Sequence, residues 1–132
     1  MDNDQMRELA NQFLTAFRNA DQSLLWLVTV EEVEWALPGN SIVSGMAKGR
    51  WAVLNRIRQL RHFEAHFELL SLLYGVDGFA LSLHGTAKRK DECWDEYLAV
   101  VCQVELGKIY WIETMLSNVG SINRYFVTGA CD

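Results

Sequence analysis

Cysteine and histidine are scarce in this sequence, and their scarcity excludes several kinds of site. The three cysteines, Cys93, Cys102 and Cys131, are an odd number and form no CxxC motif. This pattern argues against a disulfide framework and against a zinc site, and it predicts reduced thiols. No histidine lies at metal-ligand spacing beside the acidic residues at 91–96, so we expect no metal and no cofactor.

Positive charge and long apolar runs are also missing. The 12 basic residues are outnumbered by 17 acidic ones, and the net charge of −5 disfavours nucleic acid as a partner because no positive field would attract a phosphate backbone. No run approaches a membrane span, and the acidic residues 1–4 are unlike a signal peptide, so we expect a cytoplasmic protein without a membrane partner. With 132 residues, 50% of them hydrophobic, the chain is predicted to form one domain, residues 1–132.

Proline occurs once, and its position marks the end of a strand. Val33, Trp35 and Leu37 alternate with other residues, as one face of a half-buried strand does. Pro38 follows directly, and residues 38–49 contain three of the nine glycines. Because proline and glycine interrupt regular structure, we predict that a strand ends here and a loop begins.

Apolar periodicity predicts helices in the first half of the chain and strands in the second. Helices are expected at residues 4–20 and 24–28, and a third, basic helix has Trp51, Leu54 and Ile57 on its apolar side. Strands are expected at residues 67–74, 79–88, 94–104 and 109–116. This order indicates an α+β fold, with the helices packed on one face of a curved antiparallel sheet.

Both faces of the predicted sheet are apolar. In the third of these strands Tyr97 and Ala99 share one face, while Leu98 and Val100 share the other. The helices can cover only one of the two faces. We expect a second copy of the chain to cover the other, so the protein is predicted to be a homodimer.

Several short segments between about residues 5 and 126 follow an order that points to a known family. They are residues 12–17 leading to Asn19-Ala20-Asp21, Val33-Glu34-Trp35 with Pro38-Gly39, the spacing of Gly45 and Lys48-Gly49-Arg50, and Leu106-Gly107-Lys108-Ile109. This order resembles the NTF2-like superfamily and, within it, the SnoaL-like group related to polyketide cyclases and ketosteroid isomerase. The resemblance implies a cone in which N-terminal helices pack in the concave face of a curved, mostly antiparallel sheet. It also implies a deep apolar pocket, usually in a dimer.

The catalytic residues of this superfamily are replaced in this chain. Where ketosteroid isomerases carry a general-base aspartate near the end of the first strand, this chain has Trp35 or Leu37, depending on the alignment. Their oxyanion-hole tyrosine corresponds to Phe13 and their partner aspartate to Ala99. The last-strand aspartate of epoxide hydrolases and several cyclases falls near Thr114. Isomerisation of the steroid type needs a carboxylate that moves a proton, so we do not expect that chemistry.

His84 is the main candidate for catalysis. Pairing of the second and third strands is predicted to place Ser82, His84 and Thr86 on the face of Tyr97 and Ala99, which we expect to be the pocket face. A histidine there is able to act as a general base, with the Tyr97 hydroxyl holding or relaying a proton. The alternative is a buried histidine satisfied by a neighbouring hydroxyl or carbonyl.

The predicted pocket combines aromatic, aliphatic and small polar side chains. The ligand-binding residues that we expect are Phe13, Phe17, Trp35, Ser82, Thr86, Ala99, Ile112, Thr114 and Leu116. Aromatic stripes at these spacings also form ordinary cores, and in the cone implied by the resemblance the core and the pocket wall are continuous.

Three other groups of polar residues have simpler interpretations. A two-residue turn at Asp77-Gly78 would turn His66 away from the face of His84, so His66 is not included among the catalytic residues. In the acidic cluster around the next turn, only Asp95 is expected to face inward, and no metal site is predicted there. The basic helix of residues 48–61 is expected to present a solvated face.

Three functions fit this sequence. The first is a SnoaL-like protein that binds a small apolar or aromatic molecule and isomerises, cyclises or dehydrates it with His84. The second is a binding or accessory module of the same fold without chemistry, which the missing carboxylates favour. The third is a structural subunit of a larger enzyme, a role that NTF2-like chains also fill. The fold alone does not choose among them.

Overall fold

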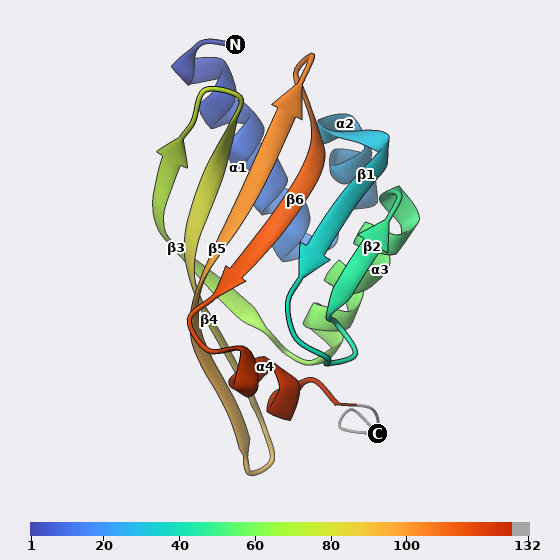
Figure 1. Cartoon of the computed structure of the whole chain (residues 1–132), viewed down its shortest axis with the longest axis vertical. Coiled ribbons are helices and arrows are strands. Elements are labelled where there is room, and N and C mark those ends of the chain that lie inside the picture. The colour runs from blue at the N-terminus through green and yellow to red at the C-terminus, as the bar shows by residue number, and fades with distance from the viewer. Residues whose placement is uncertain (128–132) are drawn as a thin grey trace.

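The computed structural model describes residues 1–127 and has four helices and six strands in that range (Figure 1). The helices are α1 Asn3–Asn19, α2 Gln22–Val28, α3 Arg50–His62 and α4 Val119–Tyr125. The strands are β1 Thr29–Leu37, β2 Gly45–Lys48, β3 His66–Tyr74, β4 Gly78–Arg89, β5 Glu92–Glu105 and β6 Lys108–Leu116. No helix in the described part is long and apolar enough to cross a membrane. Cys93 and Cys102 are free thiols, while Cys131 lies outside the described residues.

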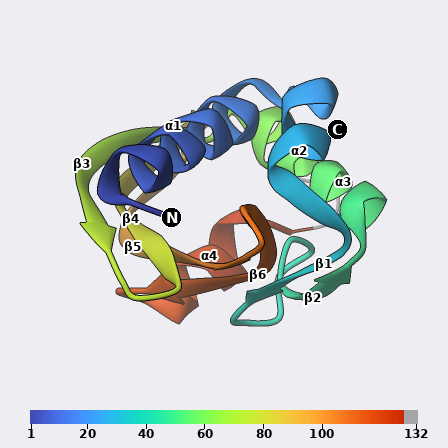
Figure 2. The same cartoon turned by 90° about the horizontal axis from the view of Figure 1, so that it is seen from above.

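The six strands form one open sheet in the order β2-β1-β6-β5-β4-β3. Neighbouring strands are antiparallel except for β1 and β6, which run parallel. Seen from above, the sheet is curved, and α1, α2 and α3 lie on its concave side (Figure 2). The predicted α+β fold, with helices in the concave face of a curved, mostly antiparallel sheet, is confirmed.

Helix α1 joins the two halves of the sheet through its aromatic side chains. Phe13 and Phe17 lie one turn apart and are almost completely buried. The ring centroid of Phe17 lies 5.9 Å from that of Trp35 on β1 and 4.8 Å from that of Phe67 on β3. Because β1 and β3 lie in opposite halves of the sheet, this one side chain helps to set the curvature of the whole sheet.

The side chains of β5 alternate between a buried and an exposed face, as a strand requires. Trp94, Leu98 and Val100 are buried under the helices, whereas Asp95 and Tyr97 are exposed on the other side. The predicted division of β5 into two sets of residues is therefore confirmed. The face that the helices cover is the one that contains Leu98.

The turn between β3 and β4 lies one residue earlier than predicted. The backbone N–H of Gly75 donates to the carbonyl of Gly78 at 2.8 Å, which makes residues 76–77 the turn. A bulge in the middle of β3 shifts the pairing again. The earlier turn moves each cross-strand partner by two residues and leaves the faces unchanged, whereas the bulge moves them by one and brings His66 onto the same face of the sheet as His84. The prediction that His66 points away from that face is wrong.

Strand β2 and helix α4 are additional to the predicted elements. β2 has four residues, lies inside the predicted loop and pairs with the end of β1. α4 has seven residues and begins after Asn118, whose side chain accepts a hydrogen bond from the Ser121 backbone. Both are too short for an apolar pattern to reveal, because a helical or strand period needs several repeats.

Helix α3 turns a different side to the core than predicted. Leu54 and Ile57 are buried, but Trp51 is 63% exposed and meets the ring of Trp26 edge-on at 5.0 Å. Arg56, which was expected on a solvated face, is only 6% exposed. The apolar pattern of α3 is weak because an arginine occupies one of its inward positions.

The buried Arg56 guanidinium connects α3 to the ends of two strands. Nη1 donates to the carbonyl of Trp35 at 2.9 Å, and Nη2 donates to the carbonyl of Gly45 at 3.0 Å. The guanidinium carbon also lies 5.0 Å from the centroid of the Trp35 ring. Burial lowers the pKa of Arg56 to about 10, which still leaves the group charged at neutral pH. Arg56 therefore fixes the β1–β2 corner against the helix layer.

We predict that Arg56→Met lowers the free energy of unfolding by about 2–4 kcal/mol, because two carbonyls lose a charged hydrogen-bond donor while the aliphatic stem is retained. Arg56→Lys keeps the charge but cannot form both bonds, so we expect about half of that loss. Urea unfolding followed by tryptophan fluorescence measures both variants. Equal stability of Arg56→Met and the wild type would show that these bonds contribute nothing.

Candidate functional site

The interior between the helices and the concave face is apolar and nearly filled. A cavity of about 10 Å³ remains there. Its lining residues are Phe17, Trp35, Leu37, Leu60, Phe67, Trp94, Leu98, Val100, Thr114, Leu116 and Ile122. Four of the predicted ligand-binding residues, Phe17, Trp35, Thr114 and Leu116, are in this lining, and Phe13 and Ile112 are buried core residues. The space is about that of one water molecule, so a ligand would need the core to open.

Trp35 and Thr114, which the sequence comparison places at or near carboxylate positions of similar enzymes, bond to each other here. The indole Nε1 of Trp35 donates to the hydroxyl of Thr114 at 2.7 Å, and both side chains are buried. Neither an indole N–H nor a threonine hydroxyl takes up a proton near neutral pH. This part of the interior can therefore orient a ligand but cannot serve as a general base.

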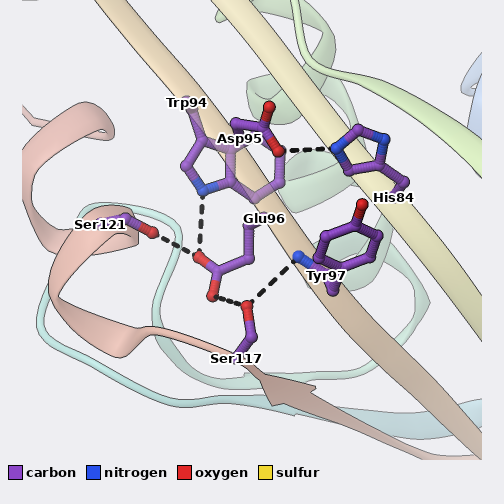
Figure 3. Close-up of polar contacts among 7 residues, drawn as sticks. All are labelled: His84, Trp94, Asp95, Glu96, Tyr97, Ser117 and Ser121. Carbon is purple, nitrogen blue, oxygen red and sulfur yellow. Dashed lines mark hydrogen bonds and ion pairs between the residues drawn. The ribbon is translucent and has the colours of Figure 1, made fainter.

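Glu96 is the carboxylate on the concave face, and sequence analysis missed it. It is 1% exposed, and it accepts hydrogen bonds from Trp94 Nε1 at 3.2 Å, Ser117 Oγ at 3.0 Å and Ser121 Oγ at 2.5 Å (Figure 3). The backbone N–H of Asn118 donates to it as well. These donors surround both carboxylate oxygens and attach the start of α4 to β5. The geometry gives Glu96 a structural task.

The expectation that Asp95 faces inward is wrong, and the side chain that does so is Glu96. The two residues are neighbours on a strand and so must point to opposite faces. The alternation of Trp94, Leu98 and Val100 with Asp95 and Tyr97 was the signal that could have found Glu96, since Glu96 shares the parity of the buried set.

The predicted pairing around His84 is confirmed, but its predicted face is wrong. His84 lies opposite Tyr97, and Ser82 lies opposite Ala99. These residues and Thr86 project from the sheet side that the helices leave uncovered, and Tyr97 is 58% exposed. We call that side the outer face. The residues predicted to line the pocket from β4 and β5 therefore do not reach the interior cavity.

His84 nevertheless takes part in an ordered polar cluster on the outer face. Its imidazole Nε2 lies 2.6 Å from Asp95 Oδ1, and its ring stacks on that of Tyr97 with centroids 4.6 Å apart and planes 15° from parallel (Figure 3). The His84 side chain is 23% exposed and the Asp95 side chain is 70% exposed. A carboxylate in this position fixes the orientation of an imidazole. The roles predicted for His84 and Tyr97 in catalysis stay predictions.

His66 and Glu68 extend this cluster across β3. Glu68 lies opposite His84, and His66 lies opposite Thr86. In the part of the chain that the structure describes, no three histidine, cysteine or acidic side chains come together in a way that could hold a metal ion. The strand pairing brings these polar side chains onto one face without forming a metal centre.

Two adjoining clefts open where α1 and α3 end beside the start of β3. The larger has a volume of about 690 Å³ and the smaller about 260 Å³. Residues that line both are Arg18, Asn19, Arg61, Ala65 and His66. The larger cleft lies within the size range of small-molecule sites. Among the predicted ligand-binding residues, Thr86 lines the larger cleft and Phe17 the smaller.

The smaller cleft adjoins the interior cavity. Phe17, Leu60 and Phe67 line both of these spaces. The side chain of Arg18 crosses from α1 to β3, where Nε and Nη2 donate to the carbonyl of Phe67 at 3.0 and 2.9 Å. Arg61 Nη1 donates to the carbonyl of Arg18 at 3.2 Å, so the helix ends are joined at this point. The clefts and the cavity together form the candidate binding site.

No protein-family model matches the sequence, and no curated protein matches it. Solved structures match its fold closely. The structure of Bal32a from a soil-derived mobile gene cassette superposes with a TM-score of 0.85 at 22% identity, covering 93% of this chain and 97% of that one. An NTF2-like protein from Burkholderia xenovorans LB400 gives a TM-score of 0.78 at 16% identity, with coverage of 96% and 98%.

A putative SnoaL-like polyketide cyclase from Jannaschia sp. CCS1 gives a TM-score of 0.70 at 8% identity, covering 86% of this chain and 85% of that one. Identities this low establish similarity of fold, and the similar structures extend over nearly the whole of this chain. The resemblance predicted from the sequence is confirmed at that level. This chain has the NTF2-like fold, which it shares with structures described as NTF2-like and SnoaL-like.

Proposed function

We propose that this protein binds a small apolar or aromatic molecule in the clefts at the ends of α1 and α3, without acting on it chemically. The observation that carries the proposal is the floor of the smaller cleft, where Phe17, Leu60 and Phe67 also line the adjoining interior cavity. Aromatic and aliphatic walls with a few polar groups at the rim are typical of small-molecule sites. The fold shared with a putative polyketide cyclase supports a ligand of this kind.

A binding role without chemistry is supported by the residues at the interior end of this site. The interior cavity, within the described residues, has Thr114 and two tryptophans as its polar members. Glu96 is buried nearby, but its two oxygens already accept hydrogen bonds from β5 and the start of α4. A proton-transfer enzyme needs a base within reach of the substrate. These observations support the accessory or binding module over the isomerase, cyclase or dehydratase.

We expect N-phenyl-1-naphthylamine, an uncharged aromatic dye, to bind the wild-type protein with a rise in its fluorescence. Ala65 lines both clefts, so Ala65→Phe should fill the entrance and weaken binding about tenfold or more, equivalent to ~1.4 kcal/mol. Fluorescence titration measures both affinities.

Ala52→Phe is the matched control, because Ala52 is also half-buried but lies on α3 outside the lining of both clefts. It should bind the dye as the wild type does. If the dye fails to bind the wild-type protein, the proposed function is wrong. If Ala65→Phe and Ala52→Phe bind equally, the ligand enters elsewhere.

A second candidate function is supported by the polar cluster on the outer face. The short His84–Asp95 contact and the stacked Tyr97 form an arrangement that suits a general base. Such a base would act on a ketone or polyketide-like compound held against the outer face, and not on one in the clefts. The hypothesis that His84 is catalytic therefore places the reaction on the outer face of the sheet.

If His84 is a general base, the wild-type protein will exchange the α-protons of a ketone substrate for deuterium, and His84→Ala will slow that exchange about 10²–10⁴-fold. Mass spectrometry of a panel of ketones in heavy water measures the exchange. His62→Gln, a change at the end of α3, is the control and should retain the wild-type rate. Full exchange by His84→Ala would eliminate this role.

We also expect the outer face to pair two copies of the chain. Leu73, Tyr97 and Met115 are each more than half exposed, and a large apolar surface of this kind favours association. Sedimentation at micromolar concentration should give twice the 15.1 kDa chain mass. Met115→Lys should shift the protein toward monomer, whereas Leu106→Lys, at a fully exposed hairpin position, should not. A wild-type monomer would contradict the dimer.

A further inference from the structure

The rim of the larger cleft is positively charged in a protein that is acidic as a whole. Its lining includes Arg18, Arg61 and Lys88 against one carboxylate, that of Glu64. The complete chain, by contrast, carries a net charge of −5. A concave surface with low-dielectric walls concentrates the field of the charges around it, so this rim attracts anions more strongly than isolated surface charges do.

Part of this positive charge is offset by the two helix ends. Helices α1 and α3 both end near the cleft, and each C-terminus contributes about half a negative charge. The three cationic side chains outweigh the one carboxylate and the partial negative charges of the two helix ends together, so the rim stays positive. Arg18 uses two of its N–H groups on the carbonyl of Phe67, and Arg61 uses one on the carbonyl of Arg18. Both guanidinium groups are thereby held in place while they remain charged.

The charged rim and the apolar floor meet in one place. Arg18 and Arg61 line the smaller cleft as well as the larger, and the smaller cleft has Phe17, Leu60 and Phe67 in its wall. A ligand with a ring seated on these three side chains would therefore hold a substituent at the guanidinium groups. Arginine pairs with carboxylates in a planar, two-bond geometry, which favours a carboxylate as that substituent.

We infer that the ligand is an aromatic carboxylic acid, bound as its anion with the ring in the smaller cleft and the carboxylate between Arg61 and Lys88. This inference rests on the proposed function, because it assigns a ligand class to the same site. The inference adds that an uncharged aromatic molecule occupies only the apolar floor of the smaller cleft and forms no ion pair with the charged rim. Binding should weaken with rising ionic strength, since the rim is open to solvent.

The test compares 1-naphthoate with 1-naphthamide, which have the same ring and nearly the same shape but differ in charge. Each competes with N-phenyl-1-naphthylamine for the wild-type protein, and the ratio of the two inhibition constants measures the preference for the anion. We expect 1-naphthoate to compete about fivefold more strongly or better at low salt. Lys88→Gln and Arg61→Gln should each lower that preference roughly two- to fivefold, as expected for solvent-exposed ion pairs.

Two further variants separate charge from structure. Arg61→Lys keeps the charge and should retain most of the preference, while Arg58→Gln removes a charge from α3 outside the cleft lining and should leave it unchanged. Equal competition by the amide and the acid, or an unchanged ratio in both Lys88→Gln and Arg61→Gln, would overturn the inference while leaving the proposed function intact. Failure of the dye to bind at all would instead overturn the proposed function.

Discussion

The structure depends on the alternation of side chains along β5, because the helices can cover only one of its two faces. Trp94, Leu98 and Val100 are on the covered side and form the wall of the interior. Every other position must then face outward, since a strand has a period of two. The register of β4 and β6 against β5 carries this assignment across the sheet. The polarity of the interior therefore depends on which residues lie on the same face of the sheet as Leu98.

Glu96 has that parity, and burying a carboxylate is costly unless it is well bonded. The start of α4 provides the bonds through Ser117, Asn118 and Ser121. α4 is thereby held to β5, and its Ile122 closes the interior cavity. The same alternation puts His84 on the outer face with Asp95 and Tyr97. One constraint thus explains both an interior without a free base and a polar cluster outside it.

Much of the fold could be predicted from the sequence, since the longer helices and strands have clear apolar periods. The pairing of His84 with Tyr97 also follows from strand order and turn position. The face could not be predicted, because Tyr97 and Ala99 make the outer face as apolar as Leu98 makes the inner one. The burial of Glu96 could not be predicted, because a buried carboxylate is tolerated only when it accepts hydrogen bonds. The donors come from the start of α4, a helix too short to show an apolar repeat in the sequence.

The clefts could not be predicted because they belong to no single element. Arg18 and Arg61 look like ordinary basic residues in the last turns of helices, where they offset the helix dipole. Arg18 and Arg61 come to line the same cleft only because both helix ends pack beside β3. The contact of Phe17 with Phe67 then forms an aromatic floor beneath them. The same bonds that complete the two helices thus leave two fixed positive charges next to an apolar wall. Recognition of an aromatic anion, as inferred above, would add only Lys88 to the arginines and aromatic side chains that the packing already places at this corner.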